Sequence, residues 1–184
     1  MSRVAKLIVI TGPIGAGKSS VAQGLAKRFH SAGCSVACVD LNDVVETLSA
    51  PLEDFETSWR RARRVHGAVI GAWLRSGIDA VIAHGPFYTA EEQAALLAEV
   101  ASRQEQCCVM LLVPFEVAFE RIKDDSGRFW SKDRDFLRRT HERFSELLSE
   151  VPRCDWNFDT TQMSADEIVS ALAGSLVRDR AVDK

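Results

Sequence analysis

The sequence lacks three features that each define a class of protein. No apolar run among the 184 residues approaches the ~20 residues that a membrane-spanning helix needs. Neither sign of charge dominates, because 23 Lys and Arg stand against 26 Asp and Glu, a net charge of −3. This balance argues against long nucleic acid as a partner. The N-terminal stretch has no signal-peptide cleavage site, so we expect a cytoplasmic protein with no membrane partner.

Cysteine is present, but not in a pattern typical of a zinc site or a disulfide framework. The five cysteines are odd in number and form no C-x-x-C pair. Zinc sites need paired Cys and His spacings that this sequence does not have. Most of the five lie in segments with the character of buried strands, so we expect reduced, structural cysteines.

What the sequence does contain is an average globular composition, 46% hydrophobic and 27% charged, arranged as alternating strands and helices. This length suits one domain, which we expect to cover residues 1–184. The predicted strands are the continuously apolar segments 4–10, 35–39, 78–83, 107–113 and 156–158. The predicted helices are 18–32, 55–76, 91–103, 115–123, 133–149 and one that opens at Ser164.

This alternation predicts an α/β fold with a parallel sheet covered by helices on both faces. Burial on both faces explains why the strands are apolar at every position. In the longest helix, one stripe is expected to be buried: Phe55, Trp59, Ala62, His66, Val69 and Trp73. Ligands of such sheets bind beyond the carboxyl ends of the strands, and the candidate residues are therefore sought there.

The strongest motif follows the first strand and precedes a helix. Residues 12–19 read Gly-Pro-Ile-Gly-Ala-Gly-Lys-Ser, a full match to G-x-x-x-x-G-K-[ST]. Glycines allow successive backbone N–H groups to converge on one anion, and the helix N-terminus adds its positive dipole end. Lys18 is expected to reach the β- and γ-phosphates, and Ser19 to bind Mg²⁺. We expect ATP to be bound by Gly12, Pro13, Ile14, Gly15, Ala16, Gly17, Lys18, Ser19 and Ser20.

The motif alone does not identify the reaction, because kinases, GTPases and motor ATPases share it. The third predicted strand ends in Ala83-His84-Gly85, without the Asp-Glu pair typical of large ATPases. The Asn-Lys-x-Asp motif with which small GTPases read guanine is also missing. A small-molecule or nucleoside kinase fits the features that remain.

Asp40, at the carboxyl end of the second predicted strand, is the candidate catalytic base. A carboxylate there can accept the proton of an attacking hydroxyl, or hold Mg²⁺ through water. The alternative is that Asp40 caps a helix over residues 42–48.

A basic segment over residues 121–139 predicts an arginine-bearing lid at about residues 124–133. Such a lid would neutralise charge on the triphosphate and exclude water that competes with the acceptor. Arg128, beside Gly127, is the candidate catalytic arginine, and Arg121 and Arg134 are further candidates for contact with the nucleotide. The alternative is a solvated face paired with neighbouring aspartates.

Several segments together resemble the small P-loop kinases related to shikimate kinase, gluconate kinase and chloramphenicol phosphotransferase. They are residues 8–19, Val39-Asp40, residues 77–82 with Pro86-Phe87, residues 112–116 with Arg121, and residues 157–161. The resemblance implies a three-layer αβα P-loop NTPase fold with sheet order 2-3-1-4-5. It also implies ATP with Mg²⁺ as the phosphate donor, Asp40 as the base, and adenine packed near Arg121 and Thr160. In several relatives an Asp stands where this chain has His84.

The acceptor is expected between the ends of the second and third strands. Candidate contacts are Asp43, His84 and Arg60, the last of these in a cluster of four arginines. Each also has a structural interpretation: a solvated face for Asp43 and the arginines, and a hydrogen-bonded strand end for His84.

The leading hypothesis is an ATP-dependent kinase that phosphorylates a hydroxyl of a small metabolite or antibiotic, as a monomer or homodimer. The first alternative is a nucleoside or polynucleotide 5′-hydroxyl kinase. The second is an ATP-binding regulatory module that transfers nothing.

Overall fold

Five strands form a single parallel sheet in the order β2-β3-β1-β4-β5 in the computed structural model, which describes residues 5–48, 54–98, 100, 104–123 and 133–177. The strands are β1 (Lys6–Thr11), β2 (Val36–Asp40), β3 (Ala80–His84), β4 (Glu105–Leu112) and β5 (Trp156–Asp159). The sheet order implied by the resemblance is therefore confirmed.

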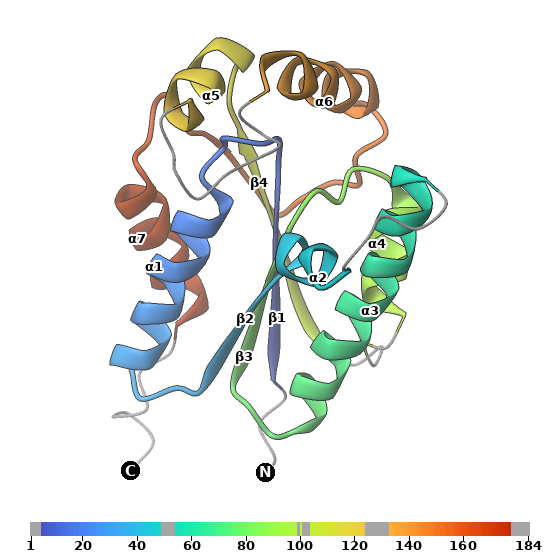
Figure 1. The fold of residues 1–184 in the computed structure, drawn as a ribbon. Helices are drawn as coiled ribbons and strands as arrows, with labels where there is room; N and C mark the ends of the chain where they lie inside the picture. Colours follow the sequence, from blue (N-terminus) through green and yellow to red (C-terminus); the bar gives the residue numbers. More distant parts are fainter. Residues whose placement is uncertain (1–4, 49–53, 99, 101–103, 124–132, 178–184) are drawn as a thin grey trace.

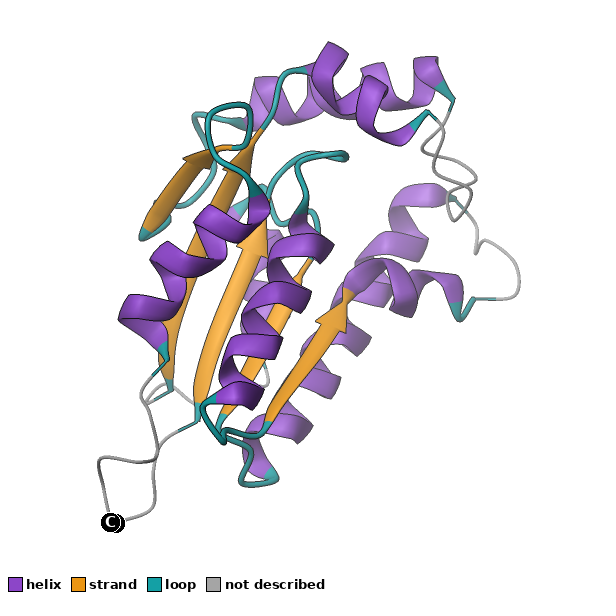
Figure 2. Ribbon diagram, turned by 90° about the vertical axis from the view of Figure 1, so that its left-hand side faces the viewer, coloured by secondary structure: helices purple, strands orange, loops and turns teal. Residues whose placement is uncertain are grey.

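Helices cover both faces of the sheet (Figure 1). One face carries α1 (Lys18–Ser31) and α7 (Ala165–Leu176), and the other carries α3 (Phe55–Arg75) and α4 (Ala90–Leu97). The short α2 (Leu41–Glu46) directly follows β2, and α5 (Phe115–Ile122) and α6 (Arg134–Leu147) lie beyond the carboxyl ends of the strands. Figure 2 shows α5 and α6 above the strand arrowheads. In the part of the chain that the structure describes, no helix is long and apolar enough to cross a membrane.

Alternate residues of the central strand belong to two different hydrophobic cores. All six residues of β1 are buried. Ile8 and Ile10 pack in the core beneath α1 and α7, whereas Leu7 and Val9 pack in the core beneath α3 and α4. The strand therefore has no solvated face, which is why its sequence is apolar without alternation.

The expectation that α4 extends to Arg103 is wrong. The helix starts with a capping box between Thr89 and Glu92 and ends at Leu97, and Ala98 is already in a turn. A helix of eight residues rises only about 12 Å, and the next strand, β4, begins at Glu105.

The predicted buried stripe of α3 is also wrong in part. Ala62 and His66 are buried, but Val69 is 36% exposed and Trp73 is 45% exposed. Each helical residue advances by about 100°, so these two lie about 100° and 60° from the buried Ile70, on the flank of the helix. The side chain of Phe55 lies outside the described part of the structure.

Two cysteines depart from the expected reduced state, because Cys108 and Cys154 form a disulfide. β4 and β5 are neighbours in register from Val109 opposite Trp156, which brings the residues just before this pair together. Their Cα atoms are 4.6 Å apart, so the sequence separation of 46 residues hides a short distance in space. The other cysteines, Cys34, Cys38 and Cys107, are not part of a disulfide.

Candidate active site

The phosphate loop between β1 and α1 requires glycine at specific positions. Gly12, Gly15 and Gly17 have backbone φ angles of 143°, 81° and 87°, values that residues with a side chain rarely adopt. A Cβ on Gly12 would lie 2.1 Å from the carbonyl oxygen of Leu111, and one on Gly15 would lie 2.7 Å from Cβ of Ala118. The loop thus packs with its main chain directly against β4 and α5.

Lys18 folds back over the loop that precedes it. Its Nζ lies 2.8 Å from the carbonyl oxygen of Gly12 and 2.9 Å from that of Pro13. This places the ammonium group above the loop, where the phosphates of a nucleotide are expected.

Three side chains from distant elements hold the loop from outside. Tyr88 Oη lies 3.1 Å from the carbonyl oxygen of Gly12. His141 Nε2 lies 2.9 Å from that of Ile14, and Arg121 Nη1 lies 3.3 Å from that of Gly15. Burial raises the pKa of Tyr88, with Glu92 adding to the effect, so the phenol stays protonated and donates. The amide of Ala16 donates to the carbonyl oxygen of Pro13 at 3.3 Å, and the other amides of the loop are candidates to bind an anion.

The N-terminus of α1 fits a phosphate and its metal ion. No described side chain caps it, its N-cap is Gly17, and its first turn contains no acid. Its positive dipole end is therefore open to an anion. The described residues contain no cluster of three or more acidic, His or Cys side chains that could hold a metal. Ser19, in the first turn of this helix, is the side chain with a hydroxyl that could hold Mg²⁺ beside a bound phosphate.

A cavity of about 250 Å³ lies beside the loop, on the α1 and α7 side. Arg121 and Thr160 line it and are bonded to each other: Nη1 lies 2.8 Å from Oγ1, and Nη2 lies 2.7 Å from the carbonyl oxygen. Ser20 and Met163 also line the cavity. The structure thus brings together the residues expected near adenine.

Asp40 ends β2 in the same row of the sheet as the end of β1. In the parallel register, Asp40 pairs with His84 of β3, and His84 pairs with Ile10, two residues before the phosphate loop. Asp40 Oδ1 accepts from the main-chain and side-chain nitrogens of Asn42, at 2.9 and 3.0 Å. Asp40 therefore does cap α2, with one oxygen, while Oδ2 lies 3.4 Å from His84 Nδ1.

His84 is 5% exposed and lies between Asp40 of β2 and Ile10 of β1, the strand that leads into the phosphate loop. Burial lowers its pKa, Asp40 opposes this by raising it, and Lys18 lowers it further. A neutral imidazole at neutral pH follows from this balance. The carboxylate of Asp40 lies beside this ring, and the positive charge of Lys18 favours its neutral form.

The other two acceptor candidates lie at the surface. Asp43 is exposed on α2, and Arg60 is exposed on α3. No contact between described residues joins Arg60 to Asp40 or His84. Within the arginine cluster it is Arg63 that faces the interior, with 4% exposure.

Glu92 connects three helices, a role that its place in the sequence does not predict. Its buried carboxylate lies 2.7 Å from Arg63 of α3 and 3.3 Å from Arg143 of α6, and accepts from the backbone of Tyr88 at 2.6 Å. The capping-box spacing after Thr89 was its only local signal, and that signal predicts a helix start and not an ion pair between helices.

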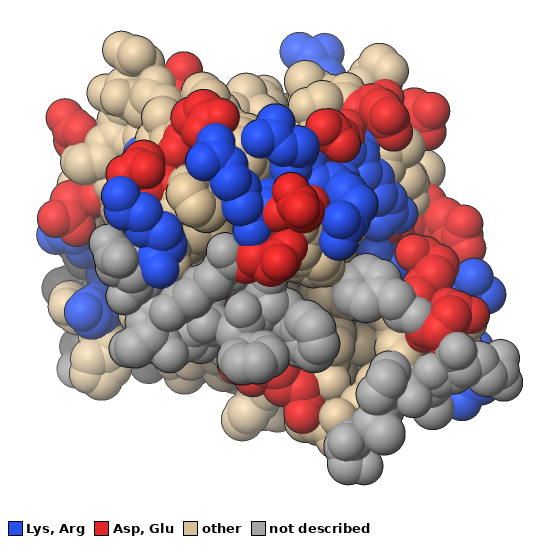
Figure 3. Space-filling view, turned by 45° about the horizontal axis from the view of Figure 1, so that its top comes forward, with Lys and Arg blue, Asp and Glu red and all other residues tan. Residues whose placement is uncertain are grey.

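The predicted lid falls largely outside the described residues, and so does Arg128. Asp133 caps α6, and Arg134 pairs with Glu116 at 3.0 Å and stacks on Phe119 at 4.8 Å. Figure 3 shows the face with α5 and α6, where basic side chains gather across the middle with acidic side chains between and around them.

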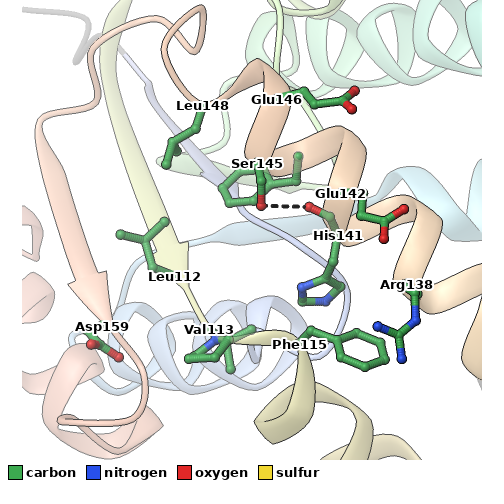
Figure 4. Close-up of a pocket in the computed structure, with 12 residues that line it drawn as sticks. Leu112, Val113, Phe115, Arg138, His141, Glu142, Ser145, Glu146, Leu148 and Asp159 are labelled. Atoms are coloured by element: carbon green, nitrogen blue, oxygen red, sulfur yellow. Dashed lines mark hydrogen bonds between the residues drawn. The ribbon is translucent and has the colours of Figure 1, made fainter.

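A second cavity, of about 610 Å³, lies between α6 and the ends of β4 and β5. Figure 4 shows the ring of His141 reaching from α6 toward Val113 and Phe115. The same His141 binds the carbonyl of Ile14, so it belongs both to this cavity and to the outer support of the phosphate loop.

Comparisons with known proteins agree with this architecture. Residues 7–147 match the family AAA_33, an AAA domain. Nucleoside-triphosphatase THEP1 of Ignicoccus hospitalis is 25% identical over 181 residues, covering 90% of this chain and 96% of that protein.

Two solved kinase structures share the fold. Shikimate kinase from Acinetobacter baumannii, in complex with shikimate, has a TM-score of 0.60 at 21% identity, covering 95% of this chain and 97% of that one. A gluconokinase from Sinorhizobium meliloti 1021 has a TM-score of 0.60 at 23% identity, covering 94% and 92%. The resemblance to small P-loop kinases is confirmed at the level of fold. The family match spans more than half of the chain and includes the phosphate loop, and the chain therefore belongs to the AAA_33 family of P-loop domains.

Proposed function

We propose that the protein is an ATP-dependent phosphotransferase that moves the γ-phosphate to a hydroxyl of a small metabolite or antibiotic. The observation that carries this proposal is the row Asp40–His84–Ile10 across three adjacent strands. It puts a carboxylate at the same edge of the sheet as the phosphate loop, two strands away, or about 10 Å. A carboxylate in this position is suited to receiving the proton of an attacking hydroxyl group.

The transfer follows from the positions of these groups. The loop amides and Lys18 hold the β- and γ-phosphates, and Ser19 would bind Mg²⁺, which spreads the phosphate charge when present. The acceptor oxygen forms a bond to the γ-phosphorus as the bond from that phosphorus to the β,γ-bridging oxygen breaks, and ADP leaves. The hydroxyl proton goes to Asp40. Arg128 is proposed to neutralise the developing charge from the lid.

The acceptor is proposed to bind between α2, α3 and the end of β3. Asp43, His84 and Arg60 remain the candidates for contact with it. Arg121 and Thr160 are proposed to hold adenine on the opposite side of the phosphate loop, where the cavity beside α1 has room for part of a nucleotide.

A nucleoside is a second candidate acceptor for the same site. A polynucleotide is less well supported. The net charge of −3 argues against a long nucleic acid strand as the acceptor. The relative THEP1 favours another candidate, hydrolysis of a nucleoside triphosphate without an alcohol acceptor.

One experiment separates these functions. ADP release from ATP·Mg²⁺ would be measured alone and with a panel of aminocyclitols, aminoglycosides, sugars and nucleosides, with mass spectrometry for phosphorylated products. We expect one class of alcohol to stimulate ADP release and to gain a phosphate. ATP turnover that no alcohol stimulates, with inorganic phosphate as the sole phosphate product, would support the hydrolase.

A further inference from the structure

His84 presents a buried nitrogen that the described residues leave without a hydrogen bond. Its Nδ1 is inaccessible to solvent and has no partner among them, although Asp40 Oδ2 is 3.4 Å away. An unsatisfied buried polar atom is costly, so the two groups gain by closing the small remaining gap. The direction of that hydrogen bond is determined by chemistry, because a carboxylate oxygen accepts and Nδ1 must then carry the hydrogen.

The rest of the carboxylate is already held. Oδ1 of Asp40 accepts from both nitrogens of Asn42 at the start of α2. A donor on Oδ2 from His84 would fix the carboxylate at both oxygens and so set the plane in which its remaining lone pairs point.

The donor is supported by a rigid element. His84 ends β3, which lies between β1 and β2, so the imidazole is anchored to the strands that carry the phosphate loop and Asp40. Groups held on central strands keep their geometry better than groups on loops.

The other two buried histidines show the opposite arrangement and serve as internal references. His66 and His141 direct Nε2 to carbonyl oxygens, of Val39 at 3.0 Å and of Ile14 at 2.9 Å. A carbonyl can only accept, so their neutral rings must carry the hydrogen on Nε2.

We propose that His84 is a positioning residue for Asp40: its neutral ring, protonated on Nδ1, holds Oδ2 and aims the carboxylate at the acceptor hydroxyl. The role in transfer rests on the proposed function, whereas the contact itself does not. The phosphate loop, which binds ATP, does not depend on this hydrogen bond.

The contact is tested by ¹⁵N NMR of the imidazole rings in the full-length protein at pH 7.5, with His84→Asn used to assign the His84 signals. We expect His84 to be the Nδ1–H tautomer while His66 and His141 are Nε2–H tautomers. An Nε2–H tautomer or an imidazolium at His84 would overturn the proposal.

The role is tested with three substitutions in the transfer assay. Asn places its amide nitrogen near the position of Nδ1, Gln places it near that of Nε2, and Ala provides no donor. Misplacement of a reacting group costs on the order of 10²-fold, so we expect His84→Gln and His84→Ala to lower kcat by about this factor with KM for ATP unchanged. His84→Asn should recover most of the loss. His66→Gln, which keeps its Nε2 donor, is the matched control for a buried histidine in the same region.

The outcomes separate the two proposals. If wild-type protein phosphorylates no alcohol, the proposed function fails, and the tautomer still decides whether His84 holds Asp40. If transfer occurs and the three variants fall equally, in step with their unfolding free energies in urea, His84 is merely structural and the positioning role is refuted.

Discussion

The two sides of the site differ in what they are built from. Around the phosphate loop the polar groups are mostly main-chain groups, and its carbonyl oxygens are paired with Lys18, Tyr88, His141 and Arg121. On the β2–β3 side they are side chains, and two of the buried histidine nitrogens, Nδ1 of His66 and of His84, have no partner among the described residues.

Under the proposed function, this difference would separate triphosphate binding, which is general, from acceptor recognition, which is specific. A cradle of amides binds the phosphates of any nucleoside triphosphate, so it needs glycines and little else. Recognition of one acceptor needs side chains of particular shape and charge, and such groups are often left without partners until the ligand arrives. Substitutions around the phosphate loop should therefore weaken ATP binding, whereas substitutions on the β2–β3 side should impair transfer to the acceptor.

The largest effect is expected on the phosphate side. Lys18→Ala removes the cation above the loop and should lower ATP turnover by about 10³-fold or more, because charge stabilisation supplies most of the catalysis in phosphoryl transfer. ATP affinity, measured by titration calorimetry, should fall as well. Lys27→Ala, on the exposed side of the same helix, is the matched control and should leave both unchanged.

Asp40→Asn should impair transfer to the acceptor and leave ATP binding intact. Asparagine is as good an N-cap as aspartate, so α2 should stay folded. Loss of the base should lower transfer by about 10²–10⁴-fold with the ATP dissociation constant unchanged. Asp54→Asn, at the N-cap of α3, controls for the loss of a capping carboxylate. Normal transfer by Asp40→Asn would refute the base assignment.

Glu92→Gln tests the buried ion pairs that connect α3, α4 and α6. The substitution removes the carboxylate 2.7 Å from the buried guanidinium of Arg63, which keeps the longer contact to Glu56 at 3.6 Å and the contact with the ring of Trp59. Breaking a buried ion pair typically costs about 3–5 kcal/mol, and we expect a loss of this order in the unfolding free energy in urea. Glu91→Gln changes an exposed neighbour and should have little effect. Equal stability of the two variants would show that the ion pair contributes little.

Tyr88→Phe removes one of the outer supports of the phosphate loop. The ring still packs against Phe144, but the carbonyl oxygen of Gly12 loses the donor at 3.1 Å. A loss of about 1 kcal/mol in unfolding free energy is expected. ATP affinity should weaken slightly more than acceptor affinity, and the reverse order would mean that Tyr88 supports the acceptor side.

The smallest effect is a dependence of stability on pH. Burial lowers the pKa of His66 below its ordinary 6.5, so the unfolded chain binds more protons than the native protein as the pH falls below that value. Stability should therefore fall from pH 7.5 to pH 5.5, as it also should through His84 and His141, whose pKa values are lowered mainly by burial. His66→Gln should reduce the slope by about a few tenths of a kcal/mol per pH unit. An unchanged slope in urea titrations would contradict this.

The parts that the sequence predicted correctly are those with local signals. The strands are continuously apolar runs, and the phosphate loop is a contiguous motif whose glycines meet conformational needs within eight residues. The position of Asp40 at a strand end followed from the same reasoning, since parallel strands place their carboxyl ends at one edge.

The parts that the sequence missed depend on contacts between distant elements. Glu92, Tyr88 and His141 act through partners that only folding brings near, and nothing in their neighbourhood in the sequence names those partners. The pairing of Cys108 with Cys154 was hidden for the same reason. Val69 and Trp73 show a further limit, because apolar spacing predicts a stripe but not how wide the buried face is.

The short distance between Cys108 and Cys154 has a consequence for protein engineering. With Cα atoms 4.6 Å apart, Cys108 and Cys154 bring the two ends of the intervening segment together. After Cys108 the chain first completes β4 with Val109–Leu112, and it then makes an excursion from the sheet that returns just before β5. That excursion contains α5, the predicted lid and α6. It therefore forms a cassette, and exchanging it between family members with junctions after Leu112 and before Trp156 would graft one lid onto another scaffold and leave the paired residues of β4 and β5 in place.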